Sequence, residues 1–258
     1  MTSTTARRHE AVPAARRDRL GSWLRGAGWT LIWVGGLTLG FVIHQLWITT
    51  WFAQLNQDSL ADARIEYYAS ADVTEVFVDA DGAILAPGVE PAPPLDPSDV
   101  GSIPTTLIVE AKPDEHEAFA LIRIPSIERL AEGWNVVEGV SVDDLKNGAG
   151  HIPATPLPGQ PGNAVISGHR TTYGAPFHEL DELEPGDRIE VETAIGLHVY
   201  AVRSLEVVRP TDVWVTESRP GAWLTLTTCH PKFSARERLV VFAELVEGPN
   251  VQAVSVIR

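Results

Sequence analysis

Leu224-Thr225-Leu226-Thr227-Thr228-Cys229 is a short stretch in which apolar and β-branched residues lead up to a cysteine. Such a composition over six residues predicts a β-strand that is at least partly buried. Cys229 is the only cysteine of the chain, so neither an intramolecular disulfide nor a cysteine-rich metal site can form. A lone cysteine at the end of a strand is either a small buried hydrophobe or a reactive thiol that faces a cleft.

Strand-like runs recur from about Ala118 onward, where turns containing Gly and Pro separate short stretches rich in Val, Ile and Leu. Ile189 and Val191 alternate with charged neighbours, as expected of a half-buried strand. The predicted strands cover residues 120–124, 164–167, 188–193, 198–202, 205–208, 223–228 and 239–245, with helical turns at 142–146 and 177–183. Many short strands at this spacing predict an all-β domain, either a closed barrel or a sandwich, over residues 118–250.

A long uncharged stretch lies near the N-terminus. No Asp, Glu, Lys or Arg occurs between Arg25 and Asp58, and residues 28–52 are mostly apolar, with tryptophans toward both ends. A helix of about 20 such residues spans a bilayer, so residues 28–52 are predicted to form a transmembrane helix. A cleaved signal peptide is the alternative, because Ala61-Asp62-Ala63 resembles a cleavage site, but that site lies far beyond an unusually long apolar run.

Charge is distributed unevenly along the chain. Residues 1–27 hold six arginines against two acidic residues, whereas the whole chain has a net charge of −14. The positive-inside rule therefore predicts a basic cytoplasmic tail, a single-pass anchor in the cell membrane and an extracytoplasmic catalytic domain. The acidic balance argues against a nucleic-acid partner, which would require a basic face.

Two segments flank the predicted domain. Residues 53–117 are rich in proline and acidic side chains, which predicts an extracytoplasmic, semi-rigid linker with a short helix at 60–68 and a strand-like stretch at 76–78. Residues 251–258 are predicted to form a C-terminal tail.

A reactive Cys229 needs a cation that lowers its pKa and a base that moves protons. His169 follows a predicted strand just as Cys229 ends its own. Arg236 and Arg238 open the last predicted strand, and because alternate residues share a face, spacing alone does not choose between them.

Two other histidines are considered beside His169. His230 adjoins Cys229 in the sequence and is an alternative catalytic base, but successive strand residues point to opposite faces. His151 lies in a glycine turn, from which it could line the cleft as part of the substrate or oxyanion site.

Several segments, in order, resemble those of the sortase family of cysteine transpeptidases. Thr225-Leu226-Thr227-Thr228-Cys229 resembles the TLxTC signature, and residues 163–170 resemble the histidine segment of sortases. Residues 138–139, 148–151 and 158–163 match the run that leads into that histidine segment. Residues 229–239 resemble the class E version of the loop between cysteine and arginine. The resemblance covers residues 119–246.

The resemblance implies a closed eight-stranded β-barrel with short helices, here preceded by the N-terminal transmembrane helix. It implies that Cys229 is the nucleophile and His169 the catalytic histidine. Arg238 matches the catalytic arginine better than Arg236, because it stands directly before the apolar run of the last strand. Thr228 is implied to help shape the oxyanion site.

Sortases cleave a sorting motif such as LPxTG, or LAxTG in class E, between Thr and Gly. The resemblance therefore implies that secreted proteins with a C-terminal sorting signal form a thioacyl intermediate with Cys229. The acceptor would be a peptidoglycan-precursor amine, or the lysine of a pilin in polymerising members. No cofactor and no metal are predicted.

Two competing interpretations lead to different expectations. A papain-like hydrolase places its cysteine on a helix and before the histidine, whereas here His169 precedes a strand-borne Cys229. A membrane-tethered binding module with a structural cysteine would leave Cys229 inert to thiol labelling, whereas an enzyme predicts rapid, pH-dependent alkylation.

Overall fold

The computed structural model describes residues 17–44, 49–78, 83–85 and 105–257 of the chain. These residues fall into two compact units, divided between Gln45 and Leu46. Residues 1–16, the N-terminal part of the predicted basic tail, and residues 86–104, the central part of the predicted linker, lie outside the described residues.

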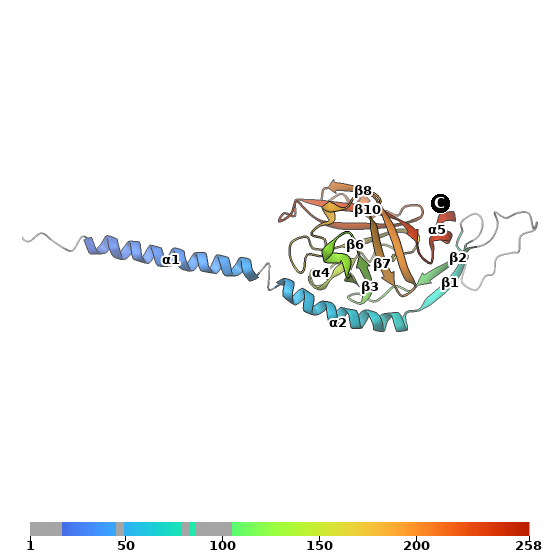
Figure 1. Ribbon diagram of the computed structural model, residues 1–258, viewed down its shortest axis with the longest axis horizontal. Helices are drawn as coiled ribbons and strands as arrows, with labels where there is room; N and C mark the ends of the chain where they lie inside the picture. Colours follow the sequence, from blue (N-terminus) through green and yellow to red (C-terminus); the bar gives the residue numbers. More distant parts are fainter. Residues whose placement is uncertain (1–16, 45–48, 79–82, 86–104, 258) are drawn as a thin grey trace, which may run out of the picture. The chain divides into compact units, whose positions relative to one another are not determined.

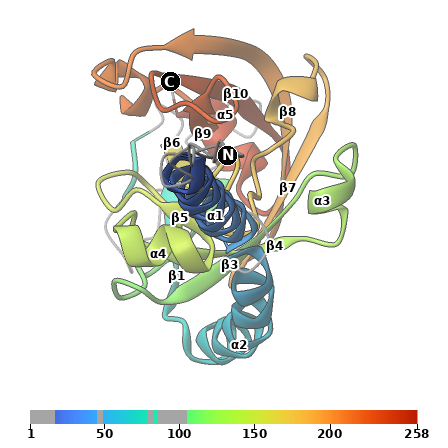
Figure 2. The same cartoon turned by 90° about the vertical axis from the view of Figure 1, so that its left-hand side faces the viewer.

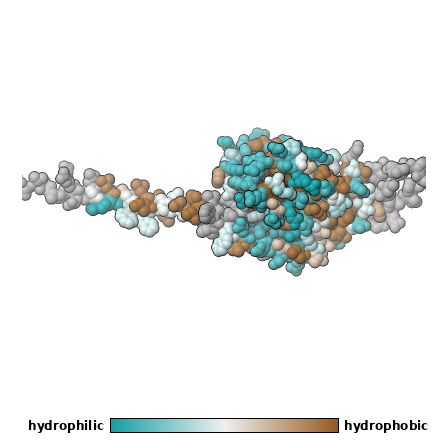
Figure 3. All heavy atoms as spheres, in the orientation of Figure 1, coloured by the Kyte–Doolittle hydropathy of each residue, from teal (hydrophilic) through white to brown (hydrophobic). Residues whose placement is uncertain are grey.

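The first unit is a single long helix, α1 (Arg17–Ile43). Within α1, residues Gly21–Ile43 are long and apolar enough to cross a membrane, and apolar side chains are exposed along this helix in Figure 3. The predicted span of residues 28–52 extends beyond this helix, because Thr49–Ser70 belong to a second helix, α2, in the other unit.

The second unit is built on a closed barrel of eight strands in the order β10-β8-β7-β3-β4-β5-β6-β9. The prediction of an all-β closed barrel with short helices is thereby confirmed (Figure 1). The strands are β3 (Ala118–Arg123), β4 (Trp134–Glu138), β5 (Ala149–His151), β6 (Gly162–Ser167), β7 (Arg188–Thr193), β8 (Gly196–Val208), β9 (Ala222–His230) and β10 (Glu237–Glu247).

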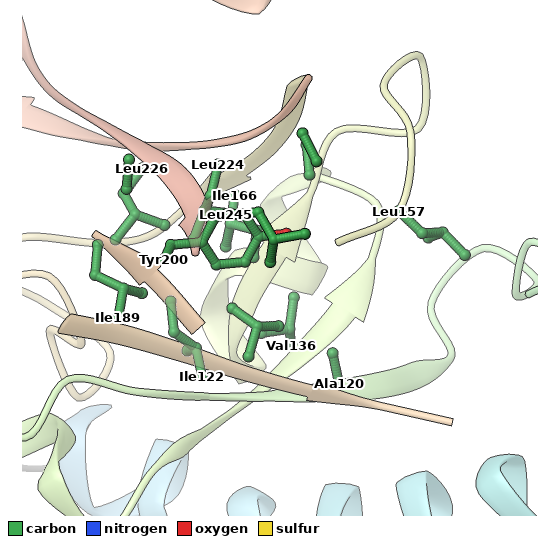
Figure 4. Packing of buried hydrophobic residues seen from close by; sticks show 14 of the residues in the cluster. Ala120, Ile122, Val136, Leu157, Ile166, Ile189, Tyr200, Leu224, Leu226 and Leu245 are labelled. Carbon is green, nitrogen blue, oxygen red and sulfur yellow. The ribbon is translucent and has the colours of Figure 1, made fainter. Parts of the chain in front are cut away.

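The core fills the inside of this barrel (Figure 4). Tyr200 stands among aliphatic side chains from neighbouring strands and is fully buried. Leu224 and Leu226 point into the same core from β9 and are also fully buried. Because strand residues alternate between faces, Thr228 points inward with these leucines, and Thr227 and Cys229 share the outer face.

Several elements differ from the predicted ones for local reasons. The predicted strands 198–202 and 205–208 are one strand, β8, in which the pairing with β10 shifts register at Arg203. The strands β4 and β5 had no sequence signal of alternation, because every residue of both is buried. The predicted turn at 142–146 is α4 (Val142–Asn147), with a capping box at Ser141, whereas 177–183 contains only the short 3-10 helix η4 (Leu180–Glu182). Two further short helices are α3 (Glu128–Ala131) and the 3-10 helix η5 (Val213–Thr216).

The described parts of residues 53–117 are more regular than a linker. The predicted helix at 60–68 is part of α2 (Thr49–Ser70), which lies along β3 and β4 in both Figure 1 and Figure 2. Gln57 and Arg64 of α2 hydrogen-bond Asn135 of β4. β1 (Val73–Val78) pairs with β2 (Thr105–Glu110), and the C-terminal segment contains α5 (Val251–Val256).

Candidate active site

The parallel pair β6 and β9 brings two predicted site residues to one edge of the barrel. Ser167 of β6 lies opposite Thr227 of β9, and the Gly168 N–H donates to the Thr227 carbonyl at 3.1 Å. The carboxyl ends of two parallel strands meet at the same edge of a sheet. His169 and Cys229 each lie two residues beyond this pair, at the same end of the two strands.

Arg238 lies directly opposite Cys229 in the antiparallel pair of β9 and β10. Side chains of such a pair share one face, with their Cβ atoms about 5 Å apart. The Arg238 Nη1 donates to the carbonyls of Ala235 and Glu237, at 3.0 Å each, which holds this half-buried guanidinium at the mouth of the strand. Arg236 precedes β10 and is exposed. The register therefore favours Arg238 over Arg236, a choice that spacing alone left open.

The imidazole of His169 is half-buried and covered on one side by Tyr173. The two ring centroids are 5.0 Å apart, at an interplanar angle of 41°. Burial lowers the pKa of His169 below its usual value, because the charged form loses hydration. His169 is therefore mainly neutral at neutral pH and able to accept a proton.

Thr228, predicted to shape the oxyanion site, has its side chain inside the barrel. It is 3% exposed, and its hydroxyl donates to the Gly168 carbonyl at 2.8 Å. This hydrogen bond ties the end of β9 to the residue that precedes His169. The hydroxyl therefore stabilises this edge from inside the barrel and does not face the cleft.

His151, predicted from its glycine turn to line the cleft, is fully buried. Its Nδ1 lies 2.6 Å from a carboxylate oxygen of Glu138, and its Nε2 lies 3.0 Å from the hydroxyl of Thr155. Lys112 is 3.3 Å from the other oxygen of Glu138. With both ring nitrogens occupied inside the protein, His151 is a core residue in this structure and is not part of the cleft.

A groove lies on the outer face of β10. It is lined by residues of β8, β9, β10, the segment that links β8 to β9 and the residue after β5, namely Ile152, Val208, Arg209, Pro210, Asp212, Val213, Val215, Thr216, Thr227, Arg238 and Val240. Thr227 and Arg238 stand at the same face as Cys229, so the groove adjoins the thiol. Its lining combines Val, Ile and Pro side chains with two arginines, an aspartate and two threonines.

Sequence reasoning missed two residues of the site. Tyr173 covers His169, and Arg170 contacts Cys229: its Nη1 donates to the Cys229 carbonyl at 3.2 Å. The sequence signal for Arg170 was its position directly after His169, which alone is also compatible with a solvated charge. Within the described ranges, no group of three or more His, Cys, Asp or Glu side chains is placed to hold a metal ion.

Comparison with known proteins defines the class of the chain. A family model described as "Sortase domain" matches residues 122–246, which include Cys229, His169 and Arg238. Sortase SrtE1 of Streptomyces coelicolor is 35% identical over 147 residues, which cover 51% of this chain and 41% of that protein. Sortase SrtE2 of the same organism is 28% identical over 240 residues, covering 86% of this chain and 81% of that protein.

Sortase D of Bacillus subtilis is 32% identical over 140 residues, covering 52% of this chain and 67% of that protein. The matched part of the chain therefore spans less than half of SrtE1 but two thirds of Sortase D. Fold and comparisons together define a sortase domain on a closed β-barrel. The chain belongs to the sortase family, and within that family it resembles the class E sortases.

Proposed function

We propose that this protein is a membrane-anchored sortase, class E-like, that cleaves an LPxTG- or LAxTG-like motif between Thr and Gly and transfers the protein to a cell-wall amine. One observation carries this proposal: the ends of three neighbouring strands supply a thiol, an imidazole and a guanidinium at one edge of the barrel. Cys229 ends β9, Arg238 lies opposite it on β10, and the register with β6 leads to His169.

The chemistry follows from the properties of these groups. The Cys229 sulfur attacks the threonine carbonyl as the thiolate, and His169, mainly neutral because burial lowers its pKa, takes the thiol proton. The proton then passes to the leaving glycine amine as the peptide C–N bond breaks, which leaves a thioester on Cys229. Attack by an acceptor amine reverses these proton transfers, releases the thiol and forms a new amide.

Arg238 supplies the positive charge that the reaction needs. The carbonyl oxygen of the scissile bond becomes negatively charged during the attack, and directed N–H donors stabilise that charge. A guanidinium presents five donors in a planar fork, so it can keep backbone contacts and still offer N–H groups toward the substrate.

The groove beside β10 suits an extended peptide. Its Val, Ile and Pro side chains match the leucine that begins the motif, and its residues Thr227 and Arg238 lie next to the thiol. A sorting motif that runs along the groove would present its threonine carbonyl to Cys229. The partners of this site are secreted proteins with a C-terminal sorting signal and an amine acceptor.

The apolar part of α1, Gly21–Ile43, suits a membrane anchor. Because the six arginines of residues 1–27 lie before this helix or near its N-terminal end, the N-terminus would lie in the cytoplasm and the barrel outside, where cell-wall acceptors are. A reporter fused after Arg258 should be active only outside the cytoplasm; activity of this fusion inside the cytoplasm would refute the orientation.

Peptide cleavage and transfer test the activity itself. The purified chain is incubated with LAxTG and LPxTG peptides and an amine, and the products are identified by mass spectrometry. We expect a peptide cut after threonine and joined to the amine, with no product from Cys229→Ala. Turnover by Cys229→Ala near that of the wild type would exclude the cysteine mechanism.

A further inference from the structure

A buried arginine lies beside the nucleophile and has no part in the chemistry described above. Arg170 follows His169 directly, and its side chain is only 2% exposed. Its Nη1 donates to the Cys229 carbonyl at 3.2 Å and to Nδ1 of His230 at 2.9 Å. Its Nη2 lies 2.9 Å from a carboxylate oxygen of Asp181. A guanidinium can bridge three such partners because its donors are fixed in a planar fork.

The carboxylate of Asp181 anchors this arginine from η4. Lys232, three residues after Cys229, lies 3.5 Å from the same oxygen. Partial burial tends to raise the pKa of Asp181, but a backbone hydrogen bond and the charges of Arg170 and Lys232 outweigh it and lower that pKa. The anchor is therefore negatively charged at neutral pH.

The contacts of Arg170 link the segment that carries His169 to the segment that carries Cys229. Its backbone continues that of His169, and its carbonyl lies 2.7 Å from Nδ1 of His178, so its position relative to the histidine segment is fixed. Its guanidinium reaches across to the carbonyl of Cys229. On the inner side, the hydroxyl of Thr228 makes a second link, to Gly168.

The contact with Arg170 also determines the hydrogen-bonding role of Nδ1 of His230. A guanidinium can only donate hydrogen bonds, so Nδ1 of His230 must accept and carries no proton in this arrangement. Nδ1 of His230 is thus occupied by Arg170, which argues against its use as the catalytic base. It also fixes the first residue after the nucleophile.

We propose that Arg170, anchored by Asp181, is a positioning residue that holds the Cys229 thiol in register with the His169 imidazole. This role rests on the proposed transpeptidase activity. Arg170 is almost fully buried, so it acts through the backbone of Cys229 and does not touch the substrate. Because a displacement of about 1 Å in reacting groups can cost on the order of 10²-fold in rate, loss of this link affects the chemical step.

The test compares steady-state kinetics of the full chain with Arg170→Lys, Asp181→Asn and the double variant. Lysine keeps the charge but cannot span the Cys229 carbonyl and the carboxylate together. Asparagine keeps the shape of Asp181 but removes the charge that holds the guanidinium. We expect kcat to fall by roughly 10- to 100-fold in each single variant, with KM unchanged. The double variant should be no slower than the slower single variant, because the two residues act as a unit.

Two control variants separate positioning from general charge effects. Lys232→Met removes a cation at Asp181 but none of the contacts to Cys229, and Arg203→Lys alters an exposed pair with Glu244 on the barrel surface. Both should keep kcat near that of the wild type. A loss in Lys232→Met equal to that in Arg170→Lys would overturn the positioning role, since a side chain that contacts Asp181 but not Cys229 would then matter as much as Arg170.

Folding of each variant is checked by its thermal midpoint. Asp181 is 41% exposed, so Asp181→Asn should fold and can decide the question even if Arg170→Lys does not. Wild-type kcat in a folded variant, a raised KM at constant kcat, or additive losses in the double variant would overturn the role of Arg170. If the wild-type chain itself shows no turnover, the proposed activity fails, which is a different result from normal turnover in the variants.

Discussion

Replacing Thr228 by valine tests whether its hydroxyl supports the fold or takes part in catalysis. Valine keeps the shape of threonine, so it leaves no cavity. It removes the hydroxyl that donates a hydrogen bond to the buried Gly168 carbonyl at 2.8 Å. A buried acceptor without its partner costs about 1–3 kcal/mol. In a domain of this size, 1 kcal/mol shifts Tm by about 2–4 °C, so Tm should fall by about 2–12 °C.

Thermal unfolding followed by circular dichroism measures this shift, and peptide cleavage measures kcat/KM on the same sample. An oxyanion donor would instead cost on the order of 10²–10³ in kcat/KM and leave Tm unchanged. That result would refute the structural role of Thr228. Thr227→Val is the matched control for stability, because Thr227 lies on the outer face of the same strand and is half-buried.

Three further predictions concern Tyr173, Arg238 and the buried His151. Tyr173→Ala should expose His169 to water and raise its lowered pKa toward the usual 6.5, so the acid limb of the kcat/KM profile should move to higher pH. NMR titration of the imidazole measures the same pKa directly, and an unchanged pKa would contradict the covering role of Tyr173. Arg238→Lys should lose on the order of 10²-fold in kcat/KM, nearly as much as Arg238→Ala, if directed donors matter more than charge, whereas Arg236→Ala should stay active. His151→Ala should lower the free energy of unfolding by about 1–3 kcal/mol in urea titration and change kcat/KM little, because it leaves the buried Glu138 carboxylate without its hydrogen-bond partner.

Much of the barrel could be predicted because its strands alternate or carry apolar runs. The predicted strand 188–193 coincides with β7, whose burial alternates along the strand. The short strands β4 and β5 could not be found, since they are buried on both faces and show no period of two. The break predicted inside β8 reflects the register shift at Arg203, where a surplus residue interrupts the alternation but not the strand.

The N-terminal region was harder to predict because tertiary contacts decide it. Composition marked residues 53–117 as a linker, yet Gln57 and Arg64 of α2 bond to Asn135 of the barrel. Tyr67 is 6% exposed and hydrogen-bonds the buried Glu110 of β2. Such pairings join residues far apart in the sequence, and no local sequence pattern predicts them.

At the site, strand alternation applies to both Arg238 and Thr228. The choice of Arg238 agrees with its register opposite Cys229. The same alternation applied to Thr228 places its side chain inside the barrel, and the family resemblance alone suggested otherwise. The role of Arg170 needed coordinates, since its partners Asp181 and His230 are 11 and 60 residues away along the chain.

The most direct test of the central claim is the intact mass of the chain after brief incubation with a sorting-motif peptide in the absence of added amine. The account predicts a mass increase equal to the peptide fragment that ends in threonine, lost on treatment with hydroxylamine and absent in Cys229→Ala. In the Arg238→Ala and His169→Ala variants, the adduct should form far more slowly than in the wild-type chain. Cleavage of the peptide with no adduct on Cys229, or an adduct that persists in Cys229→Ala, would contradict the claim that this thiol carries the acyl group.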